Sequence, residues 1–164
     1  MRVLGIDPGT YKMGVGVVTS EGSDFRLAYT GVLSPRRKDP LPDRLQFLFD
    51  GLTGVIREWQ PSEIAIEEPF AGQNWKAAMA IGQAQAVAML VAAQNGLAIS
   101  NYAPRQVKQA VTDYGGASKE QVQEMVMVLL EMDASPESSD ASDALAIAIC
   151  HINASQVDRL IMRE

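Results

Sequence analysis

The sequence has little of the residue types that build disulfide frameworks and zinc sites. Its 164 residues include one cysteine, Cys150, and one histidine, His151. A single cysteine excludes an intrachain disulfide and a multi-cysteine zinc site, so both residues are expected to be structural. No uninterrupted apolar run reaches the roughly 18 residues that a membrane span needs, and the first residues lead into a strand pattern rather than a signal peptide. The sequence therefore predicts a soluble protein of a reducing compartment, the cytoplasm.

Proline-rich tracts are also missing, and 47% of the residues are hydrophobic against 21% charged. This composition is typical of a folded chain rather than a disordered one. A length of 164 residues fits one domain with a sizeable core. Neither a linker nor a repeat divides the sequence, so we expect a single domain over residues 1–164.

Positive charge is scarce as well. The formal net charge is −6, which disfavours a nucleic-acid-binding protein because such proteins usually have a basic surface. The deficit is confined to one stretch, however. Residues 1–112 carry 11 basic and 10 acidic residues, whereas residues 113–143 carry 1 and 8. That stretch is either a solvated face or a place where carboxylates are held together for chemistry.

Strand and helix patterns alternate along the chain. Three β-rich runs with short connections come first and favour an antiparallel meander. The expected strands lie over residues 2–7, 13–19, 25–33, 63–67 and 97–102. The expected helices lie over residues 45–59, 74–94, 104–111, 118–130 and 139–157. This order predicts an α/β domain.

Local signals add detail to these elements. Asn74 and Ser118 precede helical patterns and are expected to be N-caps, the second in a capping box. Phe25, Leu27 and Tyr29 occupy every second position of the third strand run. Because side chains alternate along a strand, we expect these three to share one buried face.

Four carboxylates stand in apolar surroundings at the ends of expected elements. Asp7 and Glu67 each end a buried strand. Asp140 and Asp143 lie three residues apart at the start of an apolar helix, so their side chains point from nearly one face. Each also has a simpler interpretation: a turn-capping aspartate, a surface charge at a strand end, or first-turn acids that favour the helix dipole.

Taken together, the four carboxylates suggest a metal site. Oxygen ligands without histidine or cysteine suit Mg²⁺ or Mn²⁺ rather than zinc. Two such ions about 4 Å apart can clamp a phosphodiester, activating water on one side and stabilising the leaving oxygen on the other. The fold has to bring the four side chains together, and the sequence alone does not show that it does.

Four segments in register resemble one known family. They are residues 4–10 (LGIDPGT), 65–67 (AIE), 105–109 (RQVKQ) and 140–146 (DASDALA). Their order and spacing across about residues 2–152 resemble the RuvC Holliday junction resolvases. The resemblance implies an RNase H-like fold, with a five-stranded mixed sheet, the first three strands antiparallel, and helices on both faces. It also implies a homodimer that nicks a four-way DNA junction symmetrically and leaves 5′-phosphates, with the branch-migration proteins RuvA and RuvB as partners.

The resemblance also implies roles for single residues. It places two Mg²⁺ or Mn²⁺ ions in each active site. The implied metal ligands are Asp7, Glu67, Asp140 and Asp143. Lys119 is implied to support catalysis beside them. The implied DNA contacts are Phe70, which would stack on a junction base, Arg105 and Lys108.

For two further segments the sequence leaves two possible roles open. The Ala- and Gly-rich residues 77–93 are the expected dimer face, because small residues let backbones approach, and packing inside the chain is the alternative. Residues 36–38 (RRK) are expected either to contact a DNA arm or simply to be solvated.

Three other functions compete with a junction resolvase. Residues 5–10 (GIDPGT) also resemble the first phosphate loop of the actin and sugar-kinase ATPases, although those proteins need two such domains. A junction-binding module without catalysis is a second alternative, which the presence of all four carboxylates opposes. The third is an RNase H-like nuclease that acts on another substrate, such as an RNA–DNA hybrid.

Overall fold

The structure, a computed structural model, describes residues 1–22, 24–68 and 74–161. Within these residues five strands form one sheet in the order β3-β2-β1-β4-β5. The strands are β1 (Arg2–Asp7), β2 (Met13–Glu21), β3 (Asp24–Leu33), β4 (Glu63–Glu67) and β5 (Ala98–Tyr102). The pairs β1–β2 and β2–β3 are antiparallel, and β1–β4 and β4–β5 are parallel. The expected mixed sheet that begins with three antiparallel strands is confirmed.

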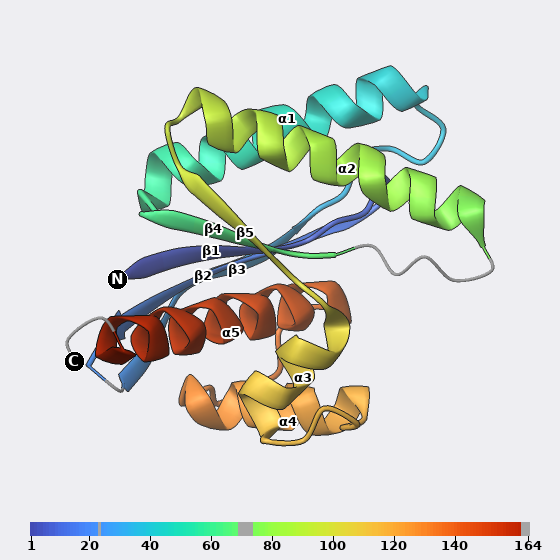
Figure 1. Ribbon diagram of the computed structural model, residues 1–164. Helices are drawn as coiled ribbons and strands as arrows, with labels where there is room; N and C mark the ends of the chain where they lie inside the picture. The colour runs from blue at the N-terminus through green and yellow to red at the C-terminus, as the bar shows by residue number, and fades with distance from the viewer. Residues whose placement is uncertain (23, 69–73, 162–164) are drawn as a thin grey trace.

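Helices cover both faces of this sheet (Figure 1). Two helices, α1 and α2, lie on one face, and α5 lies on the other with α3 and α4 beyond it. The described helices are α1 (Leu41–Trp59), α2 (Trp75–Gln94), α3 (Pro104–Thr112), α4 (Lys119–Leu129) and α5 (Ser139–Ile161). Each face of the sheet has its own cluster of buried apolar side chains. The sheet is therefore the middle layer of three.

The close fit of α5 on the sheet depends on glycines in the strands beneath it. A Cβ on Gly5 would collide with the Ala144 carbonyl oxygen, and one on Gly14 would collide with the backbone of Asp140. Gly14 is also the residue that pairs with Asp7 at the end of β1. The bare strand surface therefore lets the acidic start of α5 lie against the acidic end of β1.

Both expected N-caps are confirmed. The Asn74 side chain accepts a hydrogen bond from the Ala77 backbone N–H at 3.1 Å. Ser118 accepts one from the Gln121 N–H at 3.2 Å, and Gln121 in return accepts from the Ser118 N–H at 2.8 Å. This reciprocal pair satisfies two otherwise unpaired donors and fixes the start of α4.

The expectation that Phe25, Leu27 and Tyr29 share one face is wrong. A β-bulge leaves Ala28 without a partner across the β2–β3 pairing. One extra residue reverses the alternation of side chains beyond it. Phe25 and Leu27 accordingly pack in the α5 layer, whereas Tyr29 packs on the opposite face. There it stacks on Trp59 with ring centroids 5.3 Å apart.

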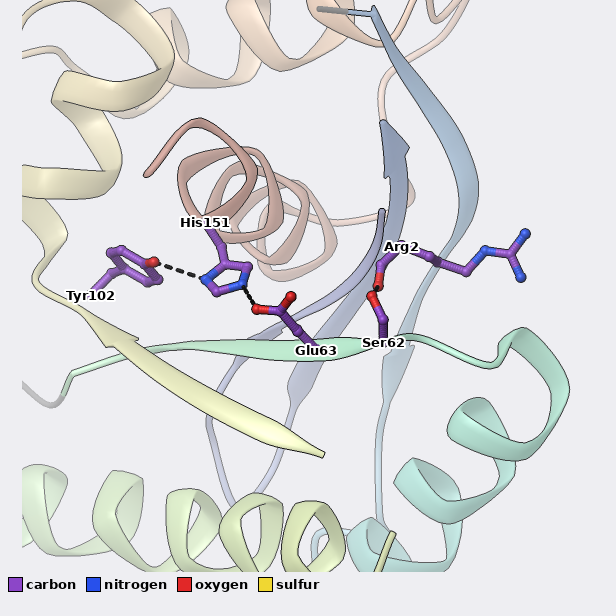
Figure 2. A network of polar contacts seen from close by, with 5 residues as sticks. All are labelled: Arg2, Ser62, Glu63, Tyr102 and His151. Carbon is purple, nitrogen blue, oxygen red and sulfur yellow. Dashed lines mark hydrogen bonds and ion pairs between the residues drawn. The ribbon is translucent and has the colours of Figure 1, made fainter. Parts of the chain in front are cut away.

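A buried polar network fastens α5 to the parallel strands (Figure 2). The His151 side chain lies between two partners, the Tyr102 hydroxyl 2.8 Å from Nδ1 and the Glu63 carboxylate 2.8 Å from Nε2. With Glu63 ionised, Nε2–H donates to the carboxylate and the Tyr102 hydroxyl donates to Nδ1. Both ring nitrogens therefore have protein partners, as expected of a structural histidine. Burial also raises the pKa of the adjacent Cys150 thiol to about 12, which keeps it protonated.

One described helix, α2, is long and apolar enough to cross a membrane by length and composition. The sequence-based expectation of no membrane span considered uninterrupted apolar runs, and Lys76, Gln83 and Gln85 interrupt α2. The mean hydropathy of the helix is high in spite of these polar residues. Such a helix is weak evidence for a membrane protein. In the fold α2 packs on α1 and β5 and buries Ala84 and Ala88 completely. It belongs to the layer that covers the sheet.

Candidate active site

Four carboxylates gather at one edge of the sheet. Asp7 ends β1 and Glu67 ends β4, and because these strands are parallel and in register through Ile6 and Ile66, the two side chains leave at the same level. Asp140 comes from the first turn of α5 and Asp143 lies three residues further along it, and this end of the helix lies against the same edge. All four side chains are half-buried. The fold therefore brings the four side chains to one edge of the sheet, which the sequence alone could not establish.

The start of α5 is fixed by a residue that the sequence analysis did not single out. The Ser138 hydroxyl accepts a hydrogen bond from the Ala141 N–H at 3.2 Å and so caps the helix. The serines before Asp140 are the usual signal of an N-cap. Gly14 was also missed, although glycine at alternate positions of β2 is a recognisable signal of a strand face left open for a helix.

The carboxylates interact strongly enough to change their proton affinities. Burial and the negative charges of Asp143, Glu67 and Asp140 raise the pKa of Asp7 to about 7. Burial and Asp143 also raise the pKa of Glu67, against a smaller opposing effect of Lys119 and Lys108. The cluster therefore lacks positive charge, and a bound cation would stabilise it.

Two lysines supply part of the missing charge. Lys119, the first residue of α4, places its Nζ 2.7 Å from Oδ2 of Asp143. That hydrogen bond, more than any other contact, raises the pKa of Lys119 and keeps it protonated. Lys108 projects from α3 toward Glu67, and all four residues line a cleft of about 190 Å³. The cleft therefore combines carboxylates with fixed cations, an arrangement suited to a phosphate ester and a metal ion.

The donor set fits a hard divalent cation. As the side chains are placed, no three Asp, Glu, His or Cys residues in the described part of the chain are close enough to share an ion. Asp143 is engaged with Lys119 instead. The chemistry nevertheless fits, because the donors are carboxylate oxygens and, besides burial, three neighbouring carboxylates contribute to the raised pKa of Asp7.

Arg105, another predicted DNA contact, does not line this cleft. Arg105 lies on another side of α3 and lines a separate, largely apolar groove together with Tyr102 and Val157. Phe70 lies outside the residues that the structure describes. Of the predicted contacts within the described residues, Lys108 is therefore the one that the fold places beside the carboxylates.

Comparison with known proteins identifies the family. The sequence profile of the family described as crossover junction endodeoxyribonuclease RuvC matches residues 3–151. The chain belongs to the RuvC family. Two curated RuvC proteins illustrate the likeness: that of Dehalococcoides mccartyi is 48% identical over 92% of both chains, and that of Chloroflexus aggregans is 50% identical over 92% of both.

Solved RuvC structures agree with this assignment. The RuvC of Thermus thermophilus in complex with a Holliday junction substrate superposes with a TM-score of 0.92 at 33% identity, covering 96% of each chain. Another structure of the Thermus thermophilus RuvC gives a TM-score of 0.89 at 34% identity, covering 96% of this chain and 97% of that one. The expected RNase H-like fold is thereby confirmed. RuvC proteins are metal-dependent endodeoxyribonucleases, in keeping with the carboxylate site.

Proposed function

We propose that this RuvC-family chain resolves four-way DNA junctions by paired symmetric nicks. One observation carries the proposal: carboxylates of β4 and α5 line one cleft with Lys119 and Lys108, and the β1 carboxylate Asp7 interacts with them electrostatically. Membership of the RuvC family supplies the substrate, because a relative of the same fold is described in complex with a Holliday junction. A nuclease acting on chromosomal recombination intermediates works in the bacterial cytoplasm. Partnership with RuvA and RuvB belongs to the same proposal.

In this mechanism the carboxylates and Lys119 have different roles. Asp7, Glu67, Asp140 and Asp143 would hold two Mg²⁺ or Mn²⁺ ions, which supply positive charge at the scissile phosphate and acidify water. Lys119 orients Asp143 and can donate to a phosphate oxygen, because its Nζ lies within the cleft. The carboxylates are carried by strands and a helix rather than by long loops, which favours a preorganised site for the DNA. Hydrolysis leaves a 5′-phosphate on each cut strand.

The substrate assignment is tested by comparing three substrates. A synthetic four-way junction, a linear duplex of the same sequence and an RNA–DNA hybrid are incubated with Mg²⁺, Mn²⁺ or EDTA. We expect paired nicks in the junction with either metal, none with EDTA, and little cutting of the linear duplex. Cleavage of the hybrid with the junction left intact would establish the alternative RNase H-like nuclease instead.

Lys119 offers a graded test of the site. We expect Lys119→Met to slow single-turnover cleavage about 10- to 100-fold, since one cationic donor is lost while the carboxylates stay. Lys119→Arg should recover part of the rate. The neighbouring Glu120 is exposed and does not line the cleft, so Glu120→Gln is the matched control and should cut at the wild-type rate. Equal rates for Lys119→Met and wild type would remove Lys119 from the mechanism.

The proposal includes a homodimer formed through α2. An apolar stripe runs along its outer face, with Trp75 63% exposed, Met79 54%, Met89 40% and Leu90 54%. Residues at this spacing lie on one side of a helix, and a continuous exposed apolar face indicates a contact surface. Two copies of the chain would match the two-fold symmetry of a four-way junction.

Disrupting the stripe tests the dimer. We expect Leu90→Glu to give a monomer by light scattering at micromolar concentration and to abolish paired nicking, because a charge would be buried in the interface. Val128→Glu introduces the same charge at a residue of α4 that is 67% exposed and should stay dimeric. Wild-type protein that is monomeric at this concentration would contradict the proposal.

A further inference from the structure

Two loops beside the catalytic cleft form a basic surface that the mechanism above does not use. One is the turn after Asp7 that joins β1 to β2, and the other joins β3 to α1. β3 ends at the level of Gly14, the partner of Asp7, because Gly14 pairs with Val32. Both loops therefore lie at the carboxylate edge of the sheet, on the side where α1 begins (Figure 1). Strands are about 4.8 Å apart, so the β3 end is roughly 10 Å from that of β1.

The β3–α1 loop presents its cations from an ordered turn. The Asp39 N–H donates to the Arg36 carbonyl oxygen at 3.0 Å and closes the turn. Arg37 and Lys38 occupy its two central positions, and both side chains are exposed. No ion pair is found for Arg36, Arg37 or Lys38 within the part of the chain that the structure describes. These charges are therefore available to a ligand.

A buried arginine supports the neighbouring turn. Arg44 of α1 is 8% exposed, and its Nη1 donates to both the carbonyl and the hydroxyl oxygen of Thr10, each at 3.2 Å. The guanidinium lies 3.9 Å from the centre of the Tyr11 ring, a cation–π contact that holds the ring. Its Nε finds no hydrogen-bond partner among the described residues. Arg44 has no ion-pair partner among the described residues, so it adds positive charge beneath Tyr11 while it fixes the turn that follows Asp7.

The two loops enclose a cleft. Tyr11, which is 49% exposed, and Arg37 line a hollow of about 310 Å³. One wall offers an aromatic ring with a hydroxyl group, and the other offers a guanidinium that can grip a phosphate with two hydrogen bonds. The buried charge of Arg44 makes the potential here more positive, because low-dielectric surroundings screen it weakly.

We propose that Tyr11 and Arg37 bind the phosphate backbone of a DNA arm a few nucleotides from the cut. Successive base pairs of a duplex rise about 3.4 Å, so the roughly 10 Å between the strand ends corresponds to about three base pairs. Sugar and phosphate contacts fix the register of a duplex without reading its sequence. The inference rests on the proposed function, since it takes the cleaved junction as the source of the arm.

The salt dependence of binding tests this surface. Binding of a fluorescent junction and of a linear duplex is measured between 50 and 300 mM salt, in an Asp7→Asn background that prevents cleavage. Each phosphate contact contributes about −0.9 to the slope of log K against log salt. We expect Arg37→Gln to weaken binding of both DNAs about three- to tenfold and to reduce this slope by about one. Arg57→Gln removes the same charge from the last turn of α1, far from the loops, and should leave the slope unchanged.

A second measurement locates the contact on the DNA. Methylphosphonate linkages, which carry no charge, are placed one at a time at the five phosphates on either side of the cut. If Arg37 binds one of these phosphates, the loss of binding free energy from its methylphosphonate and the loss from Arg37→Gln will not be additive. Tyr11→Leu should weaken binding at the same linkage, and Tyr11→Phe should do so by less.

The outcomes separate this inference from the proposed function. Three results would overturn the DNA-arm surface and leave junction cleavage untouched. Arg37→Gln could show the wild-type slope of log K against log salt, or a change no larger than that of Arg57→Gln. Alternatively, the losses of binding free energy from Arg37→Gln and from the methylphosphonate could add at every linkage. A wild-type protein that binds the duplex as well as the junction, and leaves the junction uncut, would overturn the proposed function. The duplex slopes would still decide whether Tyr11 and Arg37 contact DNA.

Discussion

Asp7→Asn should abolish cleavage and at the same time make the metal-free protein more stable. The loss of activity follows because Asp7 lies at the centre of the cluster, where it interacts with Glu67, Asp140 and Asp143. Replacing a carboxylate by an amide removes a charged ligand without changing its shape. We expect at least about a thousandfold slower single-turnover cleavage, as is typical when charge stabilisation of a transition state is lost.

The gain in stability follows from the proton affinity of the same residue. The pKa of Asp7 rises from 3.8 to about 7 on folding, mainly through burial. A carboxyl group with a raised folded pKa costs stability as pH rises from about 4 to 7, and the full cost applies above that range. Each pKa unit corresponds to about 1.4 kcal/mol, so we expect Asp7→Asn to stabilise the metal-free protein by about 2 to 4 kcal/mol at pH 8. The gain should vanish near pH 4.

Thermal unfolding in EDTA as a function of pH measures this difference. Asp133→Asn makes the same change of net charge at an exposed residue outside the cleft, and its melting temperature should follow that of the wild type. Millimolar Mg²⁺ should raise the melting temperature of the wild type more than that of Asp7→Asn, because a ligand that binds only the folded state stabilises it. A metal-free Asp7→Asn protein less stable than the wild type at pH 8 would contradict the electrostatic picture of the site.

The elements of the fold were largely predictable because local signals agree with the final packing. The strand runs and the caps at Asn74 and Ser118 each point to the observed structure. The face of Tyr29 was not predictable, because the bulge at Ala28 depends on how β2 and β3 pair. Hydrophobic alternation alone does not reveal an inserted residue.

The candidate site was likewise predictable from the sequence only in part. Asp7 and Glu67 were predictable as carboxylates that follow buried strands. The approach of α5 to the end of β1 was not, because it depends on which helix packs on the glycines of β2, a tertiary contact between Gly14 and Asp140. Arg105 is a predicted DNA contact that the structure places away from the carboxylate cleft. It lies in the same short segment as Lys108, yet the two residues line different hollows on either side of α3, a difference that depends on how α3 packs and that the spacing of the two residues does not reveal.

The acidic balance of the chain also acquires a structural explanation. Within residues 113–143, Asp140 and Asp143 belong to the site. The other acidic residues of that stretch are exposed: Asp113, Glu120, Glu124, Glu131, Asp133 and Glu137. The basic loops, in contrast, lie at the carboxylate edge of the sheet. Positive and negative side chains are therefore concentrated on different parts of the molecular surface. Net charge therefore says little about whether such a protein binds DNA, and its distribution says where.

Gly14→Ala should damage both the fold and the reaction, although it adds a single methyl group. The new Cβ would collide with the Asp140 backbone, so the first turn of α5 has to move away from β2. Overpacking of this kind costs about 1 to 3 kcal/mol. Displacing catalytic groups by about 1 Å can slow a reaction about 100-fold. We therefore expect a lower melting temperature and, well below that temperature, single-turnover cleavage slowed about 100-fold or more.

Two matched glycine variants separate these effects. Gly54 lies inside α1, and a Cβ added there would have no heavy atom outside the local helix backbone within 4 Å, so Gly54→Ala should stabilise the protein by about 0.5 to 1 kcal/mol and leave cleavage unchanged. Gly16 faces α5 two residues further from the carboxylates, where a Cβ would lie 2.7 Å from Leu145 Cδ2. Gly16→Ala should therefore destabilise the fold with a smaller loss of activity. Equal rates for Gly14→Ala and Gly16→Ala at equal stability would show that the approach of Asp140 to Asp7 does not control cleavage.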